Sequence, residues 1–121
     1  MVLTTYNKAK QLLLLSYIGR VRPGDLERSR DELRGLLPEL NPGFRLLVDL
    51  TSLESIDLDC ADVIGELMKL MDQGGVGMVV RVIPDPQKDI GMNILTIFHY
   101  RKPRQIVTCQ KLMEAAGALS L

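Results

Sequence analysis

The chain has 121 residues, of which 46% are hydrophobic and 25% are charged, and its 15 basic residues balance its 15 acidic ones. These values predict one domain over residues 1–121 with a hydrophobic core, and a net charge of zero argues against a duplex nucleic-acid binder. The run Leu12–Leu15 is too short for a signal peptide and no stretch is long enough to span a membrane, so we expect a cytoplasmic protein.

The first third of the sequence predicts a β-hairpin followed by a helix. Alternating apolar residues indicate strands at residues 2–8 and 12–21, and the polar residues between them favour a turn. Pro23 and the acidic residues that follow it are typical of a first helical turn, and a stripe of leucines continues the helix to residue 40. Asn41-Pro42-Gly43 then ends this helix.

The rest of the sequence alternates strands with helices. Runs of apolar and β-branched residues predict strands at residues 44–50, 76–83 and 105–108. Helices are predicted at residues 60–73, 89–100 and 111–118. The order β-β-α-β-α-β-α-β-α predicts an α/β fold, with a mixed, mostly parallel sheet of about five strands and helices packed against it.

Residues 57–62, with the sequence DLDCAD, are the first candidate for a functional surface. They follow a buried strand and open a helix, where open α/β folds usually bind their ligands. Asp57 or Asp59 is expected to cap this helix, and capping alone is one interpretation. We favour capping combined with recognition over a metal site, which needs more converging oxygen ligands. The predicted partner-binding residues are Asp57, Leu58, Asp59, Cys60 and Asp62.

The two cysteines, Cys60 and Cys109, match no metal-ligand spacing. A helix N-terminus lowers the pKa of a thiol, but the carboxylates around Cys60 oppose formation of a thiolate. The only histidine, His99, lies in a different predicted element, so no Cys–His pair is indicated. We therefore expect both cysteines to be core residues, and we expect no catalytic residue, no cofactor and no enzymatic activity.

The predicted helix over residues 89–100 is the second candidate surface, because it is apolar nearly all round. Such a helix is either buried or faces a partner or a ligand. A homodimer interface, a protein-docking surface and an apolar pocket each fit, and a wide core contact is the alternative. A basic loop follows the helix and could bind an anion. The residues that this surface would use are Ile90, Ile94, Phe98, His99, Arg101 and Arg104.

The sequence LLVDLTSLESIDLDCADVIGEL resembles the STAS family, named for sulfate transporters and anti-sigma factor antagonists, and the element order agrees along the whole chain. The family pattern is an apolar strand ending in Asp-Leu, then an apolar residue followed by Asp-Ser-Ser-Gly at a helix start. Asp49-Leu50 matches the first part, and Ile56-Asp57 matches the start of the second. Leu58 stands at the first serine, Asp59 stands at the serine that switching members phosphorylate, and Cys60 replaces the glycine.

This resemblance implies a non-catalytic regulatory or protein-interaction module, similar to bacterial anti-sigma factor antagonists, with another protein as its partner. The chain resembles the divergent, sporulation-antagonist-like branch of the family more than it resembles the phosphorylated members. Asp59 is no acceptor for a serine kinase, but it imitates a phosphorylated residue with about one negative charge instead of nearly two. The alternative function is the binding of a small apolar or anionic ligand in a pocket beside the helix over residues 89–100.

Overall fold

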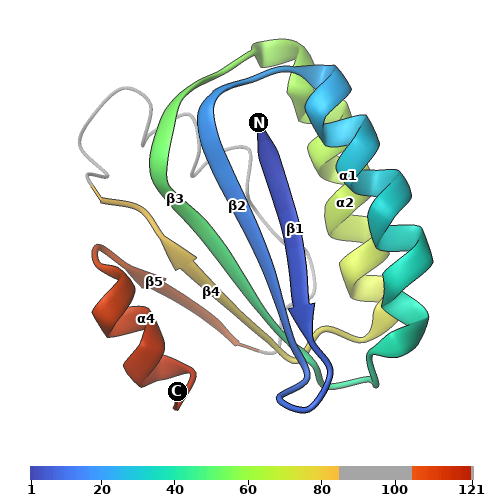
Figure 1. Cartoon of the computed structure of the whole chain (residues 1–121), viewed down its shortest axis with the longest axis vertical. Coiled ribbons are helices and arrows are strands. Elements are labelled where there is room, and N and C mark those ends of the chain that lie inside the picture. The colour runs from blue at the N-terminus through green and yellow to red at the C-terminus, as the bar shows by residue number, and fades with distance from the viewer. Residues whose placement is uncertain (85–104, 121) are drawn as a thin grey trace.

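The computed structural model describes residues 1–84 and 105–120, which form a twisted sheet with helices on both faces (Figure 1). The described elements are β1 (Val2–Asn7), β2 (Leu12–Val21), α1 (Pro23–Leu36), η1 (Leu37–Glu39), β3 (Arg45–Ile56), η2 (Leu58–Cys60), α2 (Ala61–Gly74), β4 (Met78–Val82), β5 (Ile106–Cys109) and α4 (Leu112–Ala118).

The five strands lie in the order β1-β2-β3-β4-β5. β1 and β2 form the antiparallel hairpin, whereas β2 with β3, β3 with β4, and β4 with β5 are parallel pairs. α1 lies between β2 and β3, and α2 lies between β3 and β4, because a chain needs a crossover to return to the same end of a sheet. The α/β class, the mixed sheet and the order of the described elements agree with the prediction from the sequence.

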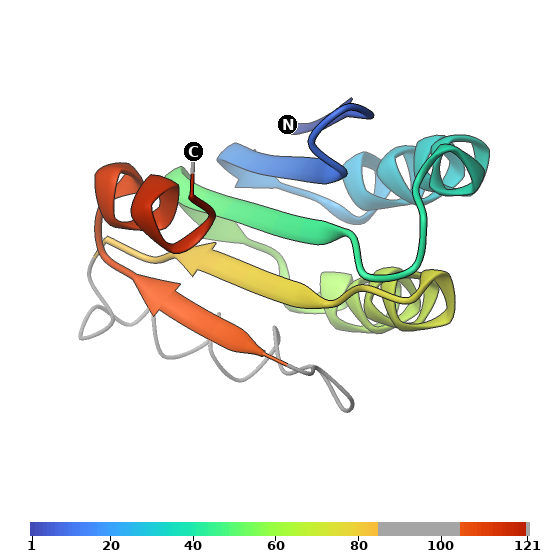
Figure 2. The same ribbon diagram turned by 90° about the horizontal axis from the view of Figure 1, so that it is seen from below.

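Helices lie on both faces of the sheet (Figure 2), and an apolar layer lies between the sheet and the helices on each face. The larger layer lies between the sheet and the pair α1 and α2, and it includes Leu13, Leu46 and Ile64. The smaller layer lies under α4 on the opposite face, where Leu47 and Ala115 are buried. Because β3 is covered on both faces, its sequence is a continuous apolar run instead of an alternation.

The strand predicted at residues 44–50 is longer in the structure, where β3 runs from Arg45 to Ile56. Its pairing with β4 ends at Asp49, but β2 continues to supply partners as far as Ile56. Among the described strands, the part of β3 beyond Asp49 pairs only with β2, so it is less enclosed by the sheet and contains polar residues. In the sequence these polar residues resemble a turn. The register shifts on both sides of Gly19, whose φ of +66° is a conformation that glycine adopts readily.

Other predicted boundaries shift by a few residues. The first helix ends at Leu36 and continues as the 3-10 turn η1, because Pro38 lacks the amide hydrogen that an α-helix needs. α2 ends as predicted at its glycines, and Gly75 adopts a left-handed φ of +86°. The predicted helix over residues 89–100 lies outside the described residues.

Candidate functional site

The predicted partner-binding residues lie at the end of the sheet where β2 and β3 finish and both long helices begin (Figure 1). The backbone amide of Asp57 donates to the carbonyl oxygen of Val21 over 3.1 Å, which joins the two strand ends. The turn η2 follows at once and leads into α2. This end is therefore built from two strand termini and the first turns of two helices.

Asp57 is held by a side chain that the sequence analysis did not single out. The Nε atom of Arg20 donates to Oδ1 of Asp57 over 3.1 Å, and a second guanidinium nitrogen donates to Oδ2 over 3.3 Å. These bonds and the carboxylate charge raise the pKa of the Arg20 guanidinium. The pairing of β2 with β3 contains two register shifts before it brings Arg20 beside the end of β3. Sequence spacing alone therefore does not reveal the ion pair between Arg20 and Asp57.

The prediction that Asp57 or Asp59 caps α2 is wrong. The N-cap of α2 is Cys60, which has no side-chain cap bond, and within the described residues the carboxylate of Asp59 makes neither a hydrogen bond nor an ion pair. The intervening turn η2 is closed by the amide of Cys60, which donates to the backbone carbonyl of Asp57 over 3.0 Å. The extra turn moves the helix start past both aspartates, and the carboxylate of Asp57 is bonded to Arg20 instead.

Cys60 is a core residue, as the cysteine analysis predicted, so its side chain is not exposed for the partner contact that was also predicted for it. Its side chain is fully buried, and Sγ lies 3.6 Å from the carbonyl oxygen of Val21. Burial raises the pKa of the Cys60 thiol, and the charges of Asp57 and Asp59 raise it further. Cys109 is also buried, and burial likewise raises the pKa of its thiol. Neither thiol has the depressed pKa of an activated nucleophile.

The side chains around Cys60 point to solvent. Leu58 is 77% exposed, the largest exposure of any leucine or isoleucine that the structure describes. Asp59 and Asp62 are exposed beside it, and within the described residues neither carboxylate makes a hydrogen bond or ion pair. Ala61, which the apolar pattern of this helix assigns to the buried face, is instead exposed between them. We call Leu58, Asp59, Ala61 and Asp62 the α2 entry surface.

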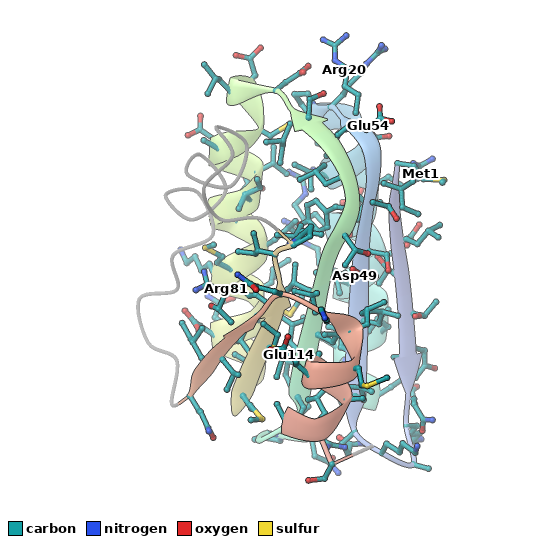
Figure 3. All side chains as sticks on the ribbon, turned by 90° about the vertical axis from the view of Figure 1, so that its left-hand side faces the viewer. Met1, Arg20, Asp49, Glu54, Arg81 and Glu114 are labelled. Carbon is teal, nitrogen blue, oxygen red and sulfur yellow. The ribbon has the colours of Figure 1, made fainter. Side chains whose placement is uncertain are left out.

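Further charged groups surround this end of the molecule. Figure 3 shows Arg20 and Glu54 at the same end of the sheet, with Asp49 farther along β3. Asp49 accepts hydrogen bonds from the amide and the hydroxyl of Thr51, at 3.0 and 2.7 Å, and so braces its own strand. Arg30 and Glu66 approach to 2.7 Å and link α1 to α2 behind the entry surface.

The second set of predicted residues, Ile90 to Arg104, lies outside the described residues. Their relation to the α2 entry surface stays a prediction. Among residues 1–84 and 105–120, no group of three histidine, cysteine or acidic side chains is arranged to hold a metal ion. In the same residues, no helix combines the length and the apolar character required to cross a membrane.

No family model matches this sequence, and no curated protein is similar to it in sequence. Solved structures do match. The anti-sigma factor antagonist SpoIIAA in its unphosphorylated form has a TM-score of 0.67 at 10% identity, covering 99% of this chain and 98% of that one. An uncharacterised protein of the DUF3478 family from Shewanella loihica, with a SpoIIAA-like fold, has a TM-score of 0.67 at 16% identity, covering 98% and 92%.

The phosphorylated form of SpoIIAA, a Bacillus cell-fate determinant, has a TM-score of 0.60 at 8% identity, covering 98% of this chain and 99% of that one. At such identities the likeness concerns the course of the backbone, and the chains agree over nearly their whole lengths. The resemblance to the STAS family is thus confirmed for the fold: this chain has the SpoIIAA-like fold.

Proposed function

We propose that this chain is a regulatory protein-interaction module without catalytic activity, and that its partner protein binds the α2 entry surface. The observation that carries the proposal is the exposure of Leu58, at 77%, beside two carboxylates that make no bond within the described residues. An exposed leucine gains free energy when a partner covers it, and flanking charges select the partner and guide its approach.

The surroundings of the surface support this role because they fix its shape. Asp57 is held by two bonds from Arg20, and Cys60 is anchored in the core. Leu58 and Asp59 therefore stand on a short turn whose two ends are both tied to the sheet. A surface that is ordered before binding loses less conformational entropy when the partner arrives.

An aspartate at position 59 would keep the negative charge of this surface constant, without any phosphorylation step. Solved structures of SpoIIAA include an unphosphorylated and a phosphorylated form. In the STAS sequence pattern, Asp59 stands at the position of the serine that switching members phosphorylate. A carboxylate is no substrate for a serine kinase, yet it carries a permanent negative charge at neutral pH. We propose that the partner has a basic or amide-lined surface opposite Asp59 and Asp62.

The test starts with native mass spectrometry of the protein purified gently from its own cells. We expect a stoichiometric second protein, retained by Met113→Ala and lost or weakened in Leu58→Ala and Asp59→Ser. Met113 is the matched control because it is 85% exposed but lies on α4, on the opposite face of the sheet. If both site variants keep the partner at full occupancy, the α2 entry surface is not its binding site.

The alternative function, a small-ligand pocket beside the helix over residues 89–100, depends on residues outside those described and stays a prediction. The same mass spectra test it. A bound small molecule without any protein partner would favour the pocket and would contradict the interaction module.

A further inference from the structure

The outer edge of β1 is unpaired in the part of the chain that the structure describes. β1 is the first strand of the sheet, and no other described strand pairs with its outer side. Figure 2 shows β1 at the upper margin of the sheet, with α1 and α2 covering one face and no described element beyond the edge. An edge strand presents a row of backbone donors and acceptors that another strand can use.

The backbone groups that point outward can be identified from the hairpin. Met1 and Ile18 exchange both of their backbone hydrogen bonds, at 2.9 and 3.0 Å. In an antiparallel ladder, such pairs alternate with pairs that make no bond to each other. The amide and carbonyl groups of Val2, Thr4 and Tyr6 therefore point away from β2, toward the free edge.

β1 lacks the features by which edge strands usually avoid pairing. Its sequence, VLTTYN, contains no charged residue and no proline. It pairs with β2 in an unbroken register, so no bulge twists its edge away. Leu3 and Tyr6 are 47% and 46% exposed. Natural edge strands are normally protected by lysine, proline or a bulge, and a strand without them is suited to a partner strand.

We propose that β1 pairs antiparallel with β1 of a second copy of this chain, about a two-fold axis at Thr4. In this register Thr4 faces its equivalent, and Val2 faces Tyr6 of the second copy. Every outward-pointing group then finds a partner, because each such pair exchanges two backbone hydrogen bonds. Because β1 carries no charged side chain, this pairing brings no like charges together.

The side chains across this junction are also compatible. On the face covered by α1, Val2 lies beside Tyr6 of the second copy, and two threonines meet at the axis. On the other face, Leu3 lies opposite Thr5 of the second copy, so the two Leu3 side chains become diagonal neighbours. Aromatic–aliphatic and threonine–threonine pairs are favourable across antiparallel strands. The result is a two-fold dimer with one continuous sheet, a closed and self-complementary assembly.

Sedimentation equilibrium tests the proposal. We expect the wild-type chain to approach twice its monomer mass of 13.5 kDa as concentration rises. Thr4→Pro should hold the mass at that of the monomer, since proline removes an outward donor while leaving the hairpin bonds to β2 intact. Thr4→Val is the matched control, because it removes the 3.0 Å hydrogen bond to Ser29 but keeps the backbone amide, and it should dimerise.

Two further measurements do not depend on the folding of Thr4→Pro. Hydrogen exchange of the Val2, Thr4 and Tyr6 amides should slow as concentration rises, whereas those of Leu3 and Thr5 stay protected throughout. In the proposed register Leu3 and Thr5 of the second copy have Cα atoms about 4.5 Å apart, within disulfide range. The double variant Leu3→Cys/Thr5→Cys should therefore form a covalent dimer on mild oxidation, and neither single variant should match it.

A wild-type chain that stays monomeric at every concentration would overturn the proposal. A dimer that persists in folded Thr4→Pro, or whose even-numbered β1 amides exchange at a constant rate, would also overturn it and assign dimerisation to another surface.

Discussion

Replacement of Leu58 by alanine separates binding from folding. Leu58 is 77% exposed, so the folded chain gains little from its side chain. Complete burial of a leucine contributes roughly 1.5–3 kcal/mol, and about three quarters of that remains to be gained when a partner covers the side chain. We therefore expect Leu58→Ala to weaken partner binding by roughly 1–2 kcal/mol, which is about a 5- to 30-fold rise in Kd.

Two assays are needed, one for each half of this prediction. Urea unfolding should show that Leu58→Ala changes the free energy of unfolding by no more than about 0.5 kcal/mol, as expected for an exposed position. Calorimetric titration with the partner identified by native mass spectrometry should show the weaker binding. Met113→Ala removes a side chain of similar exposure from α4 and should change neither quantity. A large loss of stability, or equal binding by wild type and Leu58→Ala, would refute the reasoning.

Three further predictions concern the same fold. The thiol of Cys60 should react with a disulfide reagent at neutral pH only as fast as the chain unfolds, because burial raises its pKa; rapid reaction of the folded protein would contradict its placement in the core. Asp25 has a lowered pKa, chiefly because its carboxylate accepts a backbone hydrogen bond at the start of α1. Asp25 should therefore add about 1 kcal/mol to the free energy of unfolding, relative to Asp25→Ala, at pH values above ~4. This contribution should disappear as the pH falls through the lowered pKa. A stability difference between wild type and Asp25→Ala that grows in acid would contradict the prediction. Gly75→Ala should destabilise the chain by about 1 kcal/mol or more, because φ is +86° there. Gly65 lies inside α2 with free space where a Cβ atom would stand, so Gly65→Ala should stabilise the chain by up to about 1 kcal/mol. Thermal unfolding of the two variants compares these effects.

The proposed β1 dimer and the α2 entry surface are independent of each other. The dimer uses backbone groups of Val2, Thr4 and Tyr6, whereas the entry surface uses side chains at the start of α2. Thr4→Pro should therefore leave partner binding intact, and Leu58→Ala should leave the oligomeric state intact. The β1 variants therefore test only the proposed dimer, and the variants of the α2 entry surface test only the proposed partner binding.

Local patterns were sufficient for several features of this protein. The element order, the hairpin and the parallel arrangement follow from the spacing of apolar residues and from turn residues such as Pro42 and Gly75. The burial of Cys60 was predictable as well, because carboxylates on both sides disfavour a reactive thiolate. These features depend on periodicity within one segment, and each periodicity corresponds to one way of burying that segment's apolar face.

The tertiary structure decided what depends on pairing between distant segments. β3 extends to Ile56 only because β2 is long enough to pair with it, and the same pairing brings Arg20 to Asp57 across 37 positions of sequence. That ion pair, together with the turn η2, takes the place of the cap predicted at the start of α2 and leaves Leu58 exposed. A strand's end and a carboxylate's partner are set by the neighbouring strand and its register, and no local pattern encodes them.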